Sequence, residues 1–122
     1  MRIISGSLKG RSIDFIKNST TRPLKDVVKE NIFNILKHSK LINVKIENSH
    51  ILDLYSGIGS FGIECVSRGA SKVVFVEKNK NSSNILKKNI TKFSIEEKTK
   101  VLNEKIENVL NIFDNKDFDI FF

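Results

Sequence analysis

Residues 51–62, Ile-Leu-Asp-Leu-Tyr-Ser-Gly-Ile-Gly-Ser-Phe-Gly, constrain the fold of this chain more than any other segment. A short apolar run contains an aspartate near its end, a glycine-rich turn follows, and a helical pattern begins at once. This order predicts a strand whose C-terminal end leads through a tight turn into a helix. Gly57 and Gly59 permit positive φ and a close approach of the backbone to a ligand, whereas Gly62 permits close packing of helix on sheet.

The carboxylate of Asp53 distinguishes between two kinds of ligand for this turn. A dinucleotide pyrophosphate would gain from the N–H groups and the dipole at the helix N-terminus, but a neighbouring carboxylate would repel it. A ligand that carries an ammonium and a sulfonium group is instead attracted by a carboxylate. Asp53 therefore favours S-adenosylmethionine and makes a nicotinamide-dependent enzyme the less favoured alternative.

Strand and helix patterns alternate through the rest of the chain. Strands are predicted at 50–54, 73–76, 100–102 and 118–122, and helices at 60–68, 81–92 and 104–113. Repeated strand–helix units with short connections predict an α/β fold with a parallel, doubly wound sheet.

The sequence ahead of this sheet has a different character. Two short strands, 2–5 and 11–16, form a predicted β-hairpin, and an amphipathic helix runs from Pro23 to about His38. We therefore expect two parts: a hairpin–helix segment at 1–49 and a nucleotide-type domain at 50–122.

Positive charge is concentrated in the first part. Residues 1–50 hold 10 Lys and Arg against 4 Asp and Glu, whereas residues 51–122 hold 11 against 10. This asymmetry favours a polyanionic partner, RNA or DNA, for the N-terminal segment. A lysine-rich solvated surface is the alternative. The candidate phosphate-binding residues are Arg2, Lys9, Arg11, Arg22, Lys25 and Lys29.

Composition excludes several classes of protein. Hydrophobic residues make up 39% of the chain and charged residues 29%, as in soluble globular domains. No run approaches the roughly 20 apolar residues that cross a bilayer, so we expect no membrane association. Cys65 is the only cysteine, which excludes an internal disulfide and suits a reducing cytoplasm. His38 and His50 stand alone, so we expect no metal site.

Further polar residues follow the second and third predicted strands. Glu77 ends the second strand, twenty residues after Gly57, where acidic side chains in nucleotide-binding sheets accept hydrogen bonds from ribose hydroxyls. Asn103 follows the third strand at the same predicted edge, where a polar side chain can meet an adenine base. Tyr55, beside the glycine turn, is a candidate for the wall of the pocket, and ordinary packing is its alternative role.

Four segments of the chain together resemble a known family. They are Met-Arg-Ile-Ile-Ser-Gly at 1–6 with Lys-Gly-Arg at 9–11, Thr-Arg-Pro at 21–23 leading to Ile-Phe-Asn at 32–34, Asp-Leu-Tyr-Ser-Gly-Ile-Gly at 53–59, and Val-Glu at 76–77. Over nearly all of its length the chain resembles the RsmD-type methyltransferases, which methylate the exocyclic N2 of a guanine in bacterial 16S rRNA. The Thr-Arg-Pro opening disfavours a methyltransferase acting on DNA or protein. A non-catalytic RNA-binding module is the other alternative.

The resemblance implies an architecture, a cofactor and a partner. The fold is expected to be a class I methyltransferase (Rossmann-like) sheet, incomplete in this chain, with S-adenosylmethionine as methyl donor. The expected partner is 16S rRNA in the small ribosomal subunit or its assembly intermediate, and the protein is expected to be a monomer. Asp53, Gly57 and Gly59 match the family's cofactor loop, and Glu77 matches its ribose contact.

Two departures from the family pattern stand out. The adenine-contacting position, Asp or Asn in the family, falls on Lys105, which leaves Asn103 as the alternative contact. The family's catalytic Asp/Asn-Pro-Pro-Tyr/Phe turn is expected just after Phe122. That turn accepts the hydrogens of the guanine amino group and stacks the flipped base. We therefore expect a fragment that holds the methyl donor and contains no catalytic residue.

Overall fold

A four-stranded parallel sheet forms the centre of the molecule, as predicted. The structure, a computed structural model, describes residues 1–15, 26–38 and 45–122. The strands are β1 (His50–Leu54), β2 (Lys72–Val76), β3 (Thr99–Leu102) and β4 (Ile120–Phe121), in the spatial order β3-β2-β1-β4. The helices are α1 (Asp26–His38), α2 (Ser60–Ser67), α3 (Lys80–Lys92) and α4 (Ile106–Val109), with short 3-10 turns η1 (Glu96–Lys98) and η2 (Asn115–Asp117).

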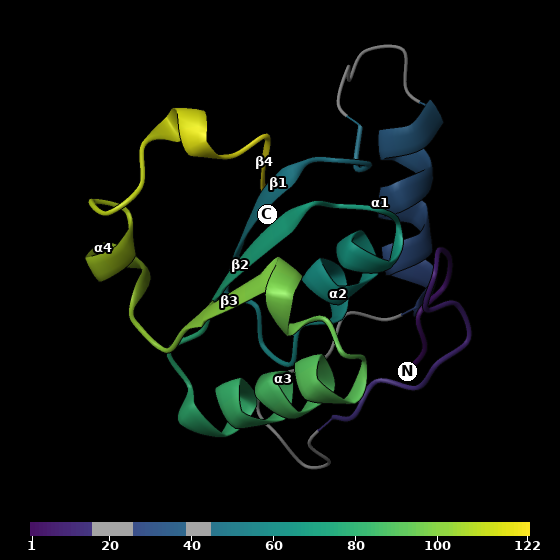
Figure 1. Cartoon of the computed structure of the whole chain (residues 1–122), viewed down its shortest axis with the longest axis horizontal. Helices are drawn as coiled ribbons and strands as arrows, with labels where there is room; N and C mark the ends of the chain where they lie inside the picture. Colours follow the sequence, from purple (N-terminus) through teal and green to yellow (C-terminus); the bar gives the residue numbers. More distant parts are fainter. Residues whose placement is uncertain (16–25, 39–44) are drawn as a thin grey trace.

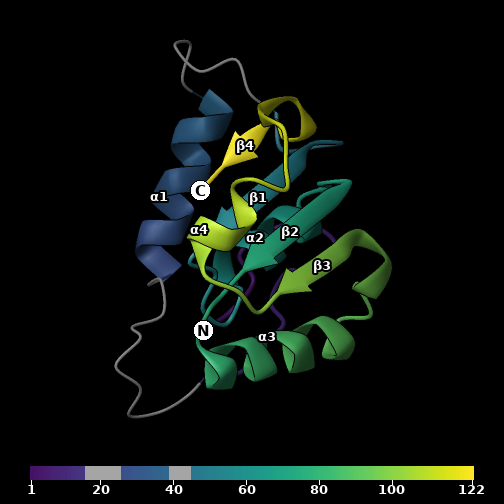
Figure 2. The ribbon, with the colours of Figure 1, turned by 90° about the vertical axis from the view of Figure 1, so that its left-hand side faces the viewer.

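The continuous apolar runs of β1 and β2 are explained by burial on both faces of the sheet. Ile51, Val73 and Phe75 belong to a core cluster on the side covered by α1, α2 and α3. Leu52 and Val74 point the other way, into a smaller cluster beneath α4. Figures 1 and 2 show α2 and α4 on opposite sides of the strands. In this doubly wound arrangement the strand order reverses between β1 and β4. Open α/β sheets bind their ligands at such a reversal of strand order.

The N-terminal segment packs into the larger core. Ile3 and Ile13 are buried in the same cluster as Phe33 of α1 and Ile63 of α2. The predicted hairpin is present as a pairing but not as two regular strands. It consists of one antiparallel bridge, between Arg2 and Ser12, with flanking main-chain hydrogen bonds. The hairpin lacks a longer ladder because its main chain bonds side chains of α2 and α3 instead. The predicted helix start at Pro23 lies outside the described residues.

The helix predicted at 104–113 is wrong in length, since α4 covers Ile106–Val109 alone. Val109 is buried, but Leu110 is 54% exposed and Ile112 is also exposed. Short helices depend on an apolar face buried against the rest of the protein. Because Leu110 and Ile112 are not buried in this way, the regular α-helix ends at Val109 and is followed by turns.

The end of the described chain lies beside the first turn of α2. The Leu54 N–H donates to the Phe122 carbonyl at 2.7 Å, which extends the pairing of β4 with β1. The Phe122 ring stacks on Phe61 with centroids 3.7 Å apart, and Phe61 stacks in turn on Phe33.

Among the described helices, none combines the length and the apolar character that crossing a membrane requires.

Candidate functional site

The glycine turn lies at the carboxyl end of β1, where the sequence predicted it. Gly57 has φ +57° and Gly59 has φ +93°, so both adopt the left-handed conformation that favours glycine. Gly59 is also the N-cap of α2. A Cβ at Gly59 would collide with a methyl group of Leu86 on α3. This glycine is therefore required both by its backbone conformation and by the packing of α3.

Ser56 fixes the start of the turn. Its hydroxyl donates to the Asp53 carbonyl at 2.6 Å and accepts from the Val76 N–H at 3.0 Å, while its own carbonyl accepts from the Gly59 N–H. The turn is thus held to both β1 and β2 before any ligand is considered. Ser56 was not among the predicted site residues, although its place just ahead of the first glycine was an available signal.

Asp53 is a buried carboxyl group at the base of the turn. Its side chain is 2% exposed and accepts a hydrogen bond from the Gly62 N–H in the first turn of α2, at 3.2 Å. Burial raises the pKa of Asp53 to about 8, and the nearby charge of Glu77 adds to that rise, whereas the Gly62 hydrogen bond opposes it. A cationic group placed here would favour the ionised form of Asp53.

Glu77 lies just after the end of β2, beside the glycine turn. One carboxylate oxygen accepts from the Gly57 N–H at 2.8 Å and the other from the Asn79 N–H at 2.8 Å. Asn103, at the end of β3, donates its side-chain amide to the Glu77 carbonyl at 2.8 Å. The ends of β1, β2 and β3 therefore form one hydrogen-bonded edge. Asn103 stabilises the chain after β2, a role that the sequence analysis did not predict.

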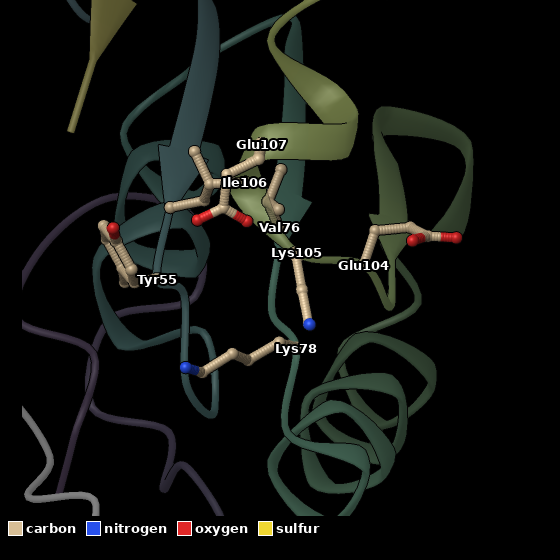
Figure 3. A pocket seen from close by; sticks show the side chains of 7 residues that line it. All are labelled: Tyr55, Val76, Lys78, Glu104, Lys105, Ile106 and Glu107. Atoms are coloured by element: carbon tan, nitrogen blue, oxygen red, sulfur yellow. The ribbon is translucent and has the colours of Figure 1, made fainter.

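A cavity of about 340 Å³ opens beside this edge. Its lining residues are Tyr55, Val76, Lys78, Glu104, Lys105, Ile106 and Glu107. Figure 3 shows the side chains of Lys78 and Lys105 reaching into the same space, while Glu104 points away. Tyr55 is 76% exposed with φ +54°, so its ring belongs to the cavity wall and not to the core. Lys78 was not among the predicted site residues, although it directly follows Glu77 at the same strand end.

The structure places the predicted RNA-binding residues in different environments. Arg2, Lys9 and Arg11 are exposed on the N-terminal segment. The Arg11 guanidinium also donates to the Lys92 carbonyl and lies over the Phe93 ring. Arg22 and Lys25 lie outside the described residues.

Lys29 requires a correction, because its side chain is fully buried and so is not available to bind a phosphate. Its ammonium pairs with Glu64 of α2 at 3.2 Å, inside the core. The positive charge of Lys29 predicted a phosphate contact, but a buried carboxylate from α2 provides its partner instead.

No metal cluster is evident in the part of the chain that the structure describes: residues 1–15, 26–38 and 45–122 contain no group of three or more His, Cys, Asp and Glu side chains placed to hold an ion. Cys65 is buried, as expected of a small apolar side chain. Burial raises the pKa of the Cys65 thiol well above its ordinary value, so the thiol is uncharged.

Comparison with known proteins relates the whole chain to one family. The family model described as "Conserved hypothetical protein 95" matches residues 1–122. Ribosomal RNA small subunit methyltransferase D of Haemophilus influenzae is 36% identical over 124 residues, covering 100% of this chain and 61% of the relative. The protein of the same name from Buchnera aphidicola (subsp. Acyrthosiphon pisum) is 37% identical, covering 98% of this chain and 59% of the relative. The chain thus spans about three-fifths of the length of these relatives.

Solved structures support the predicted fold. A protein from Haemophilus influenzae, provisionally described as a methylase, superimposes with TM-score 0.72 at 34% identity, over 98% of this chain and 61% of its own. A protein from Escherichia coli, provisionally described as a methyltransferase, gives TM-score 0.74 at 28% identity, over 90% of this chain and 55% of its own. The predicted class I methyltransferase (Rossmann-like) sheet is therefore confirmed.

Proposed function

Because the chain belongs to the family described as conserved hypothetical protein 95, we propose that it is the cofactor-binding part of an rRNA methyltransferase. The reaction is the transfer of a methyl group from S-adenosylmethionine to the N2 of a guanine in small-subunit rRNA. The substrate is the rRNA within the small ribosomal subunit or its assembly intermediate. The names of the relatives support this substrate class, and the acceptor atom follows from the family resemblance.

The observation that carries the proposal is a buried carboxyl group, Asp53, at the base of a glycine turn, with a second carboxylate, Glu77, beside it. Two neighbouring carboxylates repel one another, and this repulsion contributes to the raised pKa of Asp53. A cationic ligand removes the repulsion, whereas a pyrophosphate would add to it. The donor set therefore fits S-adenosylmethionine, which carries an ammonium and a sulfonium group.

The residues at this edge take separate roles in the proposal. Asp53 attracts the positive charge of the cofactor, and Gly57 and Gly59 allow its close approach. Glu77 keeps lone pairs available for ribose hydroxyls, since each carboxylate oxygen holds one backbone N–H and can accept a second hydrogen bond. Bound here, the cofactor supplies an electrophilic methyl group.

The adenine end of the cofactor is assigned to the cavity beside Glu77. Tyr55 offers an exposed ring for stacking, and Lys105 lines the same space. Asn103 already donates its amide to the Glu77 carbonyl, so we favour Lys105 and Tyr55 over Asn103 for contact with the base.

The acceptor side of the reaction is supplied from outside residues 1–122 in this proposal. Pro23 is the only proline in the sequence, so the Pro-Pro turn that the resemblance implies is not among these residues. We expect the 122 residues to bind the methyl donor without completing the transfer by themselves. Arg2, Lys9 and Arg11 are the described residues that contact rRNA phosphates in the proposal.

Titration calorimetry with S-adenosylhomocysteine tests the donor site. We expect saturable binding, no binding of NAD, and a loss of affinity of about 10- to 100-fold in Asp53→Ala, the usual effect of removing a charge-assisted hydrogen bond. Asp119→Ala removes an exposed carboxylate at the opposite end of the sheet and serves as the matched control. Binding of NAD in place of S-adenosylhomocysteine would overturn the proposal. RNA binding without cofactor binding would favour the non-catalytic RNA-binding module.

A further inference from the structure

Asn89 of α3 joins the glycine turn to residues 1–15 of the N-terminal segment through one buried side chain. Its side-chain amide donates to the Ile58 carbonyl inside the turn at 3.2 Å and to the Asp14 carbonyl at 3.0 Å. Its side-chain oxygen accepts from the Asp14 N–H at 2.9 Å. Asn89 is fully buried, so both hydrogens of its amide depend on these two carbonyls.

Lys29 of α1 makes a second link of the same kind. Its ammonium donates to the Arg2 carbonyl at 2.9 Å and to the Ser60 hydroxyl at 3.3 Å, and it pairs with Glu64 at 3.2 Å. The three N–H bonds of the ammonium thus have three acceptors, one on the N-terminal segment and two on α2. Lys29 is also fully buried.

The two links reach the turn on either side of Gly59. Asn89 holds Ile58, the residue before it, and Lys29 holds Ser60, the residue after it. A shift of the turn relative to the N-terminal segment would leave a buried donor without an acceptor, which is costly in a protein interior. The conformations of the turn and of the N-terminal segment are therefore not independent.

We propose that Asn89 and Lys29 are positioning residues that couple the N-terminal segment to the glycine turn, so that RNA and cofactor each raise the affinity of the other. This inference rests on the proposed function, in which the turn holds the cofactor and the segment contacts RNA. Arg2 connects the two roles directly, because its carbonyl accepts from Lys29 while its side chain is exposed.

The sign of the coupling follows from the cost of ordering. RNA held by the basic side chains of the segment restricts its main chain, and the two links pass this restriction to residues 58–60. The cofactor then binds a turn that is already partly ordered, so less conformational entropy is lost on binding. Linkage requires that the cofactor strengthen RNA binding by the same factor.

The test compares S-adenosylhomocysteine affinity with and without a short guanine-containing RNA hairpin, on the whole 122-residue chain. We expect RNA to tighten cofactor binding by about fivefold or more, within the usual range of coupling between two sites. Asn89→Ala cuts the link at Ile58 and is expected to lower this ratio well below the wild-type value, while the Lys29 link to Ser60 remains. Ser83→Ala is the matched control on the same helix. The Ser83 hydroxyl is buried, and the described residues offer it no hydrogen-bond partner, so the ratio should stay at the wild-type value.

Each result has a distinct meaning. If the unmodified chain does not bind S-adenosylhomocysteine, or does not bind RNA by fluorescence anisotropy, the proposed function fails. If it binds both and the affinity ratio is one, the coupling is wrong and the proposed function stands. An Asn89→Ala variant that folds, by its circular dichroism spectrum, and keeps the wild-type ratio also overturns the coupling.

Hydrogen exchange on the unmodified chain provides a test that needs no variant. Adding S-adenosylhomocysteine is expected to slow exchange of the Asp14 N–H, which bonds Asn89, more than exchange of the neighbouring Ile13 N–H, which bonds the Met1 carbonyl. A purely structural role for Asn89 predicts equal effects on the two amides, and equal effects would contradict the coupling.

Discussion

The carboxylate of Glu77 accepts a hydrogen bond from the Gly57 N–H at 2.8 Å, which joins the end of β2 to the turn that follows β1. Its second oxygen accepts from the Asn79 N–H, where α3 begins. Glu77 therefore shapes the glycine turn as well as offering lone pairs to a ligand. The twenty-residue spacing between Gly57 and Glu77 in the sequence corresponds to a direct contact in the structure.

Replacing Glu77 by Gln should weaken both roles. The amide nitrogen of Gln cannot accept a hydrogen bond, so either Gly57 or Asn79 loses its acceptor. We expect S-adenosylhomocysteine affinity to fall by about 10- to 100-fold and either the Gly57 or the Asn79 N–H to exchange faster. Calorimetry and hydrogen exchange measure the two effects. Glu97→Gln, an exposed change in η1, is the control and should alter neither. Unchanged exchange at both Gly57 and Asn79 would show that Glu77 does not shape the turn.

Cofactor affinity should depend on pH through Asp53. Its pKa is raised to about 8 by burial, so the carboxyl group of the free protein is largely neutral at pH 6.5 and ionised above the raised value. A cationic ligand prefers the ionised form. We expect affinity for S-adenosylmethionine to rise by about tenfold for each pH unit below that value and to level off above it. Asp53→Asn should abolish this rise, and a wild-type profile that is flat from pH 6 to 8 would contradict the assignment.

The raised pKa of Asp53 also determines how the stability of the folded protein depends on pH. Between pH 3.8, the ordinary pKa of the carboxyl group, and about 8, the folded state holds a proton on Asp53 that the unfolded state has released. This term therefore stabilises the folded state fully below the ordinary pKa and is lost as pH rises to about 8. We expect Asp53→Asn to be more stable than wild type at pH 8, by about 1–2 kcal/mol in urea unfolding. A variant that is less stable at pH 8 and equally stable at pH 5 would reverse the sign and contradict the argument.

Local signals predicted the sheet, the turn and the residues that depend on strand ends. Asp53, Gly57 and Glu77 follow directly from the order of strand, turn and helix, because parallel strands bring their carboxyl ends to one edge. Lys29 and Asn89 were beyond such reasoning, since each bonds main chain that is distant in sequence and carries no residue-type signal. The predicted helix does not continue beyond Val109 for a related reason. The sequence pattern is helical there, but Leu110 and Ile112 are exposed.

Gly62 should be intolerant of a side chain. A Cβ at this position would collide with the ring of Phe75 in β2, so α2 would have to move away from the sheet. We expect Gly62→Ala to destabilise the protein by about 1–3 kcal/mol, the usual cost of overpacking a core. Chemical denaturation measures this directly. Gly10→Ala is the control: it is strained by a φ of +84° but meets no atom within 4 Å, so it should cost about 1 kcal/mol.

A second variant separates the collision at Gly62 from other effects of the added methyl group. Phe75→Leu removes the ring that the methyl group would meet. If the collision is the cause, Gly62→Ala should cost less in the Phe75→Leu background than in the wild type, giving a favourable interaction energy in the double-mutant cycle. Equal costs in the two backgrounds would show that Phe75 is not the source of the intolerance.

Lys29→Met should report on folding and not on a direct RNA contact. The substitution keeps much of the side-chain volume but removes the ion pair with Glu64 and the hydrogen bond to the Arg2 carbonyl. Breaking one side of a buried pair typically costs about 3–5 kcal/mol. We expect a loss near the lower end, because Arg68 still bonds the Glu64 carboxylate at 2.9 Å. Lys9→Met, on the exposed turn, should change stability by less than about 0.5 kcal/mol in the same urea titration. A Lys29→Met variant as stable as Lys9→Met would contradict the burial of Lys29. It would then support the original prediction that Lys29 contacts RNA.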